Sequence, residues 1–143
     1  MSPDTLFEAS NTLALAGWLA LLLTPVAPRV ADRVAATAIP LLLAVAYAGI
    51  VLAFWSRAEG GFGSLAAVMA LFRDPWIALA GWLHYLAFDL FVGAWAVRTA
   101  RREGIAFPIV VPCLALTFLF GPAGLLAFAV LRVARTARAP ALS

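Results

Sequence analysis

The sequence predicts an all-helical membrane protein, a polytopic four-helix bundle with a short interfacial helix between its second and third spans. Hydrophobic residues make up 65% of its 143 residues and charged residues only 12%, whereas a soluble domain has roughly half and a quarter. Uncharged stretches of about 20 residues, the length that crosses a bilayer, recur along the chain. These stretches are continuously apolar, so helices are expected and a β-barrel is not. We therefore expect residues 1–143 to form a single transmembrane domain.

The first two spans are expected at about residues 7–25 and 35–55, joined by a short loop into an antiparallel hairpin. The first span carries Glu8 and Asn11 in its opening turns. Glu8 is either an interfacial carboxylate, stabilised by the positive end of the helix dipole, or a site residue together with Asn11. Pro40 fits the first turn of the second span and makes a kink if it lies deeper in the helix.

The third and fourth spans are expected at about residues 76–97 and 108–131. Before the third span, a segment at about 64–72 has helical spacing but is too short to cross a bilayer, so it is expected in the membrane interface. In the fourth span, Pro112 and the string Gly-Pro-Ala-Gly at 121–124 predict a bent or partly unwound helix. Irregular backbone at membrane depth needs cover from protein or a water-filled cavity, so this stretch should face the inside of the bundle.

The charged residues indicate contacts with membrane lipid and leave the orientation open. All ten basic residues are arginines beside the expected spans, which fits lipid headgroups and excludes nucleic acid as a partner. Four spans divide the arginines evenly between the two sides, and only the acidic N-terminus favours an outside start. That N-terminus lacks the basic start of a signal peptide, so the first span should be retained, in the cytoplasmic membrane of a bacterium. Small residues in the third span permit close helix approach and allow a homodimer: Gly81, Ala87 and Gly93.

The third span carries the candidate catalytic residues Asp89, His84 and Tyr85. An ionisable group at this depth costs free energy unless it faces a partner, a cavity or water, so it marks a functional site by default. At 100° per residue, Asp89 shares a helix face with Tyr85 and Trp82, whereas His84 points about 140° away. The alternative is that both ionisable groups are structural and only exchange hydrogen bonds with neighbouring helices. Residues on other helices that could meet His84 are Asn11, Tyr47 and Thr117.

No metal or cofactor site is expected. A single histidine and a single cysteine cannot supply a familiar set of zinc ligands, and no glycine-rich phosphate loop follows a strand. The ten phenylalanines and five tryptophans suit a lipidic or polyene ligand. The candidate substrate-binding residues lie beside Asp89 or on the first and fourth spans: Glu8, Asn11, Trp82, Thr117 and Pro122.

Three strings of residues resemble a known family. They are GWLHYLAFDLFVGAW (81–95), FEASNTLALAGWLALL (7–22) and PCLALTFLFGPAGLL (112–126). They are similar to sequences of the abscisic-acid-deficient-four membrane proteins, plant plastid proteins required for neoxanthin formation, and of their bacterial relatives. The resemblance covers nearly the whole chain. It implies an integral membrane protein of about four helices that acts on a carotenoid-like isoprenoid.

The resemblance also implies a type of chemistry. In neoxanthin synthesis an epoxide opens and a carbon-bound proton leaves to give an allene, without net redox change, so an acid and a base are needed. Asp89 and His84 would form that pair, with Tyr85 as a donor. Two alternatives remain open, a non-catalytic pigment or lipid binder or assembly factor, and a small dual-topology transporter. The sequence does not decide whether the protein is an enzyme.

Overall fold

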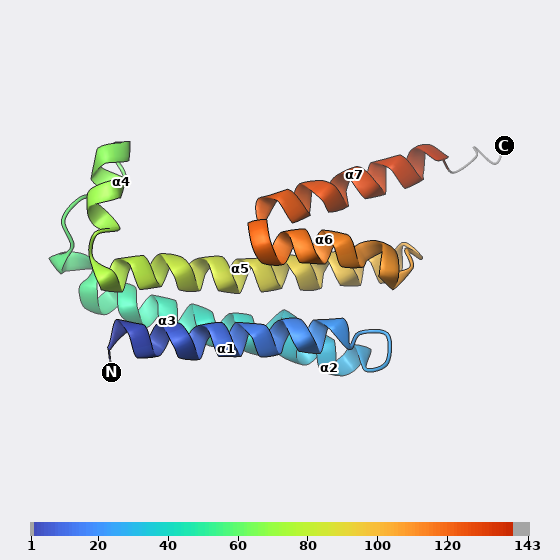
Figure 1. The fold of residues 1–143 in the computed structure, drawn as a ribbon, viewed down its shortest axis with the longest axis horizontal. Coiled ribbons are helices and arrows are strands. Elements are labelled where there is room, and N and C mark those ends of the chain that lie inside the picture. The colour runs from blue at the N-terminus through green and yellow to red at the C-terminus, as the bar shows by residue number, and fades with distance from the viewer. Residues whose placement is uncertain (1, 139–143) are drawn as a thin grey trace.

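The computed structural model describes residues 2–138, and these residues form helices joined by short loops, with no strand among them (Figure 1). The all-helical prediction is confirmed. The helices are α1 (Pro3–Leu22), α2 (Pro28–Arg33), the π-helical turn η1 (Val34–Ala38), α3 (Ile39–Phe54), the 3-10 turn η2 (Trp55–Arg57), α4 (Leu65–Leu71), α5 (Pro75–Arg102), α6 (Phe107–Phe120) and α7 (Pro122–Arg138).

Three stretches of the described chain are long and apolar enough to cross a membrane. They are Pro3–Leu22, the continuous rod Pro28–Arg57 and Pro75–Arg102. The first begins earlier than the sequence predicts, and the third begins at Pro75, close to the predicted start; each opens with a capping side chain followed by a proline in the first helical position. Ser2 accepts a hydrogen bond from the backbone N–H of Thr5 at 3.2 Å, and Asp74 accepts one from that of Trp76 at 2.8 Å.

The second span contains a π-helical turn where a kink is expected. The N–H of Ile39 donates to the carbonyl oxygen of Val34, five residues back. The next residue, Pro40, has no N–H to donate, and its ring conflicts with the carbonyl four residues before it. A wider turn relieves this conflict, so the proline perturbs residues 34–38 without ending the rod.

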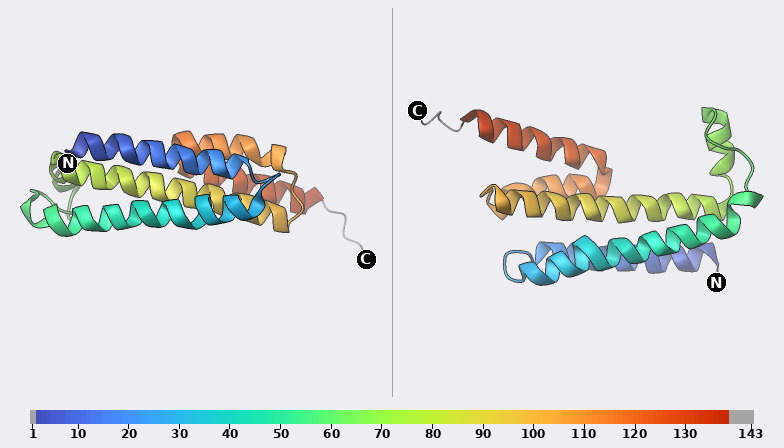
Figure 2. Two further views of the ribbon diagram at one scale, coloured as in Figure 1. Left: turned by 90° about the horizontal axis from the view of Figure 1, so that it is seen from below. Right: turned by 180° about the vertical axis from the view of Figure 1, so that it is seen from behind.

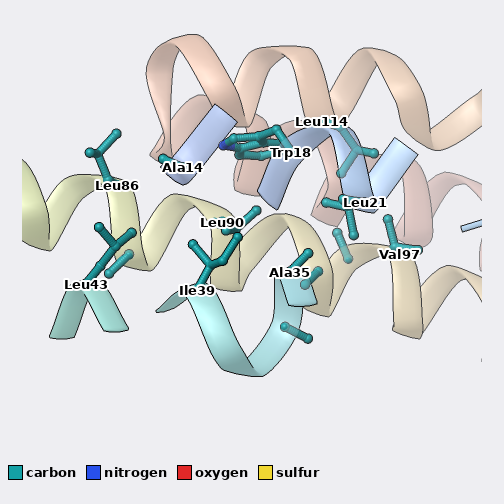
Figure 3. Packing of buried hydrophobic residues seen from close by; sticks show 14 of the residues in the cluster. Ala14, Trp18, Leu21, Ala35, Ile39, Leu43, Leu86, Leu90, Val97 and Leu114 are labelled. Carbon is teal, nitrogen blue, oxygen red and sulfur yellow. The ribbon is translucent and has the colours of Figure 1, made fainter. Parts of the chain in front are cut away.

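The hydrophobic core surrounds α5, which packs against α1, α3 and α6. In Figure 3, Trp18 of α1 lies between α5 and α6, and Leu90 lies at the centre of the cluster. Two glycines bring α1 and α5 together. A Cβ on Gly17 would be 2.4 Å from Leu90 Cδ2, and one on Gly93 would be 2.7 Å from the Trp18 ring. The small-residue positions thus serve contacts within the chain, and the homodimer remains a prediction.

The single fourth span predicted at 108–131 differs from the structure. The chain forms two helices, α6 and α7, and α7 folds back along α6 (Figures 1 and 2). The reversal occurs at Gly121, whose φ of 36° is a conformation that other residues rarely adopt. Pro122 then starts α7 in the first helical position, which suits it. With 14 residues, α6 is about 21 Å long and reaches only partway across a hydrocarbon core of about 30 Å.

The α6–α7 hairpin begins and ends at the same end of the molecule. Arg132 of α7 forms an ion pair with Glu103, directly after α5, and its Nε donates to Oε2 at 2.8 Å. The hydrogen bonds from this guanidinium hold the pKa of the Glu103 carboxyl below its usual value. The start of α1 and the end of α7 therefore lie at opposite ends of the bundle (Figure 1).

The arginines are concentrated at the end where α7 finishes. Arg57 and Arg73 lie at the opposite end, beside α4. We call the crowded side the arginine-rich end; it contains α2, the last turns of α5 and the last turns of α7, with Arg29, Arg33, Arg98, Arg101, Arg102, Arg132, Arg135 and Arg138.

The short helix expected at 64–72 is present as α4. Ser64 caps it by accepting a hydrogen bond from the N–H of Ala67 at 3.1 Å. The helix lies across the direction of the long helices (Figures 1 and 2), and the Phe72 ring that follows it contacts Gly81 of α5. Its orientation fits the predicted place in the membrane interface.

Candidate functional site

The carboxyl of Asp89 lies inside the protein, halfway along α5. Asp89 is 8% exposed, and its Oδ2 atom has no hydrogen-bond partner among residues 2–138. The carboxyl faces the turn between α6 and α7, since a Cβ placed on Gly121 would be 2.6 Å from Oδ1. A carboxyl oxygen is therefore buried without a partner among these residues, next to a break in the helical backbone.

Close contacts between α6 and α7 form this turn. The hydroxyl of Thr117 is buried and donates to the carbonyl oxygen of Cys113 at 2.8 Å. The N–H of Gly121 donates to the carbonyl oxygen of Thr117 at 2.9 Å. A Cβ on Gly124 would be 2.1 Å from the Thr117 hydroxyl oxygen. Thr117 therefore closes the hairpin by packing, and its hydroxyl is used within α6.

The turn does not face the protein interior as a whole. Thr117, Gly121 and Gly124 are buried, whereas Pro122 and Phe118 are exposed. Pro122 is exposed and starts α7, so its place in the fold gives it a conformational role.

Polar groups follow one another along α5 from Asp89 toward α1, as the helix periodicity predicts. The Tyr85 hydroxyl interacts with the Asp89 carboxyl and donates to the carbonyl oxygen of Phe118 at 3.3 Å. The Tyr85 ring stacks on Trp82 with the centroids 5.1 Å apart. The Trp82 Nε1–H donates to Oδ1 of Asn11 at 2.9 Å. We call Asn11, Trp82, Tyr85 and Asp89 the polar row.

His84 and Glu8 lie outside the polar row. His84 is exposed, and its ring lies between those of Tyr47, 5.9 Å away, and Phe88, 4.5 Å away. Of the partners considered from the sequence, His84 thus meets Tyr47 of α3. Glu8 is exposed, and its backbone carbonyl accepts a hydrogen bond from Thr12. The structure brings Tyr85 to Asp89 and separates His84 from both.

Two grooves lie along α1, one of them bordered by Trp82 of the polar row. One, of about 360 Å³, lies between the first turns of α1 and α5 and ends at Trp82. The other, of about 240 Å³, lies between α1 and α6; Phe118 is among its lining residues, and the Phe118 carbonyl accepts a hydrogen bond from Tyr85. Hydrophobic side chains line this second groove, among them Leu15, Trp18 and Leu22 of α1 and Val111, Leu114 and Phe118 of α6.

Gly121→Val is expected to destabilise the protein severely. The positive φ costs a branched residue about 1–3 kcal/mol, and overlap of its side chain with the Asp89 carboxyl adds a similar amount. We expect the melting temperature to fall by roughly 10 °C or more, or no folded protein to be recovered. Gly49→Val is the matched control, because nothing lies within 4 Å of a Cβ at this exposed position of α3. Equal melting temperatures for the two variants would contradict the turn geometry.

Within residues 2–138, no three His, Cys, Asp or Glu side chains come together as a metal site.

The sequence did not predict the contacts of the polar row with the hairpin, made by Gly121 and by the carbonyl oxygen of Phe118. The Gly-Pro pair at 121–122 was the available signal, because it breaks a helix beside the depth of a carboxylate.

Comparison with known proteins identifies a family. The family model described as ABA DEFICIENT 4-like (ABA4-like) matches residues 5–128. The chain belongs to this family. No curated protein and no solved structure matches the chain significantly.

The matched region of this ABA DEFICIENT 4-like protein contains most of the candidate site. It runs from the first turn of α1 to the middle of α7, and so includes the polar row, the turn at Gly121 and the groove between α1 and α6. Family membership supports a role related to neoxanthin synthesis, and the long apolar helices fit a membrane protein.

Proposed function

We propose that this protein binds a carotenoid-like isoprenoid and isomerises an epoxide at the end of that molecule. The observation that carries the proposal is the Asp89 carboxyl, which is buried halfway along α5 with the Tyr85 hydroxyl beside it and with no hydrogen-bond partner for Oδ2 in the described part of the chain. A carboxyl buried among membrane helices without a cation favours its neutral form, because burying a charge is costly. It can therefore give a proton to an oxygen atom of a substrate.

The hydrophobic groove between α1 and α6 suits the hydrocarbon part of such a substrate. Phe118 is among its lining residues, and the Phe118 carbonyl accepts the hydrogen bond from Tyr85. Trp18 and Phe118 meet edge to face at its inner end, with the centroids 5.5 Å apart. An apolar chain in this groove would bring an oxygenated end group toward Tyr85 and Asp89, and would exchange contact with lipid tails for contact with aromatic rings.

The reaction needs one proton donated and one removed. Asp89 gives its proton to the epoxide oxygen as the carbon–oxygen bond breaks, which leaves a hydroxyl group. The carboxylate of Asp89 then accepts the proton that leaves carbon as the allene forms. The carboxyl ends in its starting form, and the product has the same mass as the substrate. Tyr85 turns its hydroxyl hydrogen from the Phe118 carbonyl to the substrate oxygen during the transfer, and no redox cofactor is required.

Of the two alternative functions, the geometry favours the non-catalytic pigment binder over the dual-topology transporter. A non-catalytic pigment binder would use the same groove and polar row, so turnover is the test that separates it from the enzyme. A dual-topology transporter needs a weak orientation signal, whereas the arginines here gather at one end of the fold. We therefore keep the binder as the second candidate.

Incubation with an epoxy-carotenoid tests the proposal. The full chain in liposomes receives violaxanthin, and chromatography with mass spectrometry follows any product of unchanged mass. We expect an allenic isomer that forms only when the protein is present. Pigment that binds without isomerisation would support the binder, and neither binding nor product would contradict the proposed function.

A further inference from the structure

A groove at the arginine-rich end has the features of a second binding site. It has a volume of about 570 Å³ and lies between α2 and the last turns of α5. It is separate from the polar row, because Asp89 is halfway along α5 whereas this groove is at its C-terminal end. We call it the arginine groove; it is lined by Asp32, Trp95, Arg98, Arg101 and Arg102.

Positive charge in the arginine groove exceeds negative charge. Arg101 Nη1 lies 3.3 Å from Oδ2 of Asp32, which is the acidic residue of the lining. Arg102 donates to the hydroxyl of Thr99 at 3.4 Å, a neutral partner. Arg98 is half-buried and has no hydrogen bond or ion pair within residues 2–138. Guanidinium donors therefore remain available to an anion.

A lipid-facing stripe of α5 continues from the groove toward the middle of the helix. Its members recur every three or four residues, so they lie on one helix face. Aromatic residues occupy the part at membrane depth, where Phe88 and Phe91 are 57% and 45% exposed. The Trp95 ring is held in place by an edge contact to Phe128 of α7. In order, the stripe is Phe88, Phe91, Trp95, Arg98 and Arg102.

We propose that the arginine groove binds the phosphate of an anionic phospholipid, with an acyl chain lying along the aromatic stripe. Arginine is the side chain best suited to phosphate oxygens, because its guanidinium offers paired donors. Tryptophan favours the level of the headgroups, where Trp95 borders the groove. The groove and stripe together match an amphiphile that has a negative head and an apolar tail, whereas a free anion would use only the groove.

Native mass spectrometry of the detergent-purified full chain tests this site. The protein is offered equal amounts of phosphatidylglycerol and phosphatidylcholine. We expect a preference for phosphatidylglycerol that falls about tenfold in Arg98→Gln and in Arg102→Gln, because each loses a charged donor. Arg29→Gln is the matched control, since it removes a charge from an exposed arginine at the same end but outside the groove lining. Unchanged melting temperatures establish that the variants are folded.

Three results would overturn the proposal. The first is no preference between the two lipids in the unaltered protein. The second is an equal loss in Arg29→Gln, which would mean that general surface charge attracts the lipid. The third is full displacement of phosphatidylglycerol by millimolar inorganic phosphate, which would assign the groove to a free anion.

Discussion

Asp89→Asn is expected to lower epoxide isomerisation by about 10²–10⁴-fold, the usual contribution of a positioned acid or base. An amide has nearly the shape of a carboxyl but cannot give a proton to the epoxide oxygen or take one from carbon. Its Oδ2 atom has no hydrogen-bond partner to lose among the described residues 2–138, so the fold should tolerate the change. The measurement is the rate of allenic product formation in liposomes, followed by chromatography.

Two further variants isolate the role of Asp89. Glu59→Gln makes the same chemical change at an exposed carboxylate in the loop before α4, and should keep the activity of the unaltered protein. His84→Gln tests the pair of residues expected from the sequence, and should also keep most activity, because His84 faces Tyr47. Pigment that still co-purifies with an inactive Asp89→Asn protein would confirm that binding survives. Full activity of that variant would exclude Asp89 as the acid.

The end of α7 is expected on the cytoplasmic side, and the loop before α4 on the opposite side. Three spans and a returning hairpin place the loop after α5 and the end of α7 together, whereas four spans would separate them. The positive-inside rule then assigns the arginine-rich end to the cytoplasm. Single cysteines at exposed positions report this, with Cys113→Ala as background because Cys113 is the only cysteine. The positions are Ser56, Ala106 and Ala137.

A membrane-impermeant maleimide reads out the side of each cysteine. Ser56→Cys should react in intact cells, and Ala106→Cys and Ala137→Cys only after the cells are opened. These substitutions keep every arginine, so the orientation signal is unchanged. Reaction of Ala137→Cys on the same side as Ser56→Cys would restore four full spans. Labelling of every position from both sides would indicate dual topology and favour a transporter.

Periodicity within one helix predicted much of the candidate site. Asp89, Tyr85 and Trp82 lie on one face of α5 because a helix turns 100° per residue, whatever surrounds it. Contacts between helices needed the structure, since they depend on how far each helix slides and rotates against its neighbour. Two contacts between helices are examples: the hydrogen bond from Trp82 of α5 to Asn11 of α1, and the contact of the His84 ring with Tyr47 of α3. The stacking of His84 on Phe88, in contrast, lies within α5.

The two helices of the α6–α7 hairpin were predicted as one span. Residues 108–131 have the length and hydrophobicity of a single span, and two shorter antiparallel helices have the same total length. Pro112 and the glycines predicted a bend in this segment. A bend and a full reversal differ by the conformation of Gly121, whose φ is positive, and by the close packing of Gly124 on Thr117, a contact between two helices that the sequence does not display.

The hairpin also bears on how the chain is assembled in its membrane. Residues 107–131 contain no charged side chain, and the hairpin starts and finishes at the arginine-rich end. Its tip can therefore enter the bilayer from that side without carrying any charged group through the hydrocarbon, where each would cost a few kcal/mol. Translocation during biogenesis is then needed only for the N-terminus and the loop before α5. The last quarter of the protein can insert after synthesis, once α5 offers Asp89 and its neighbours as a docking face.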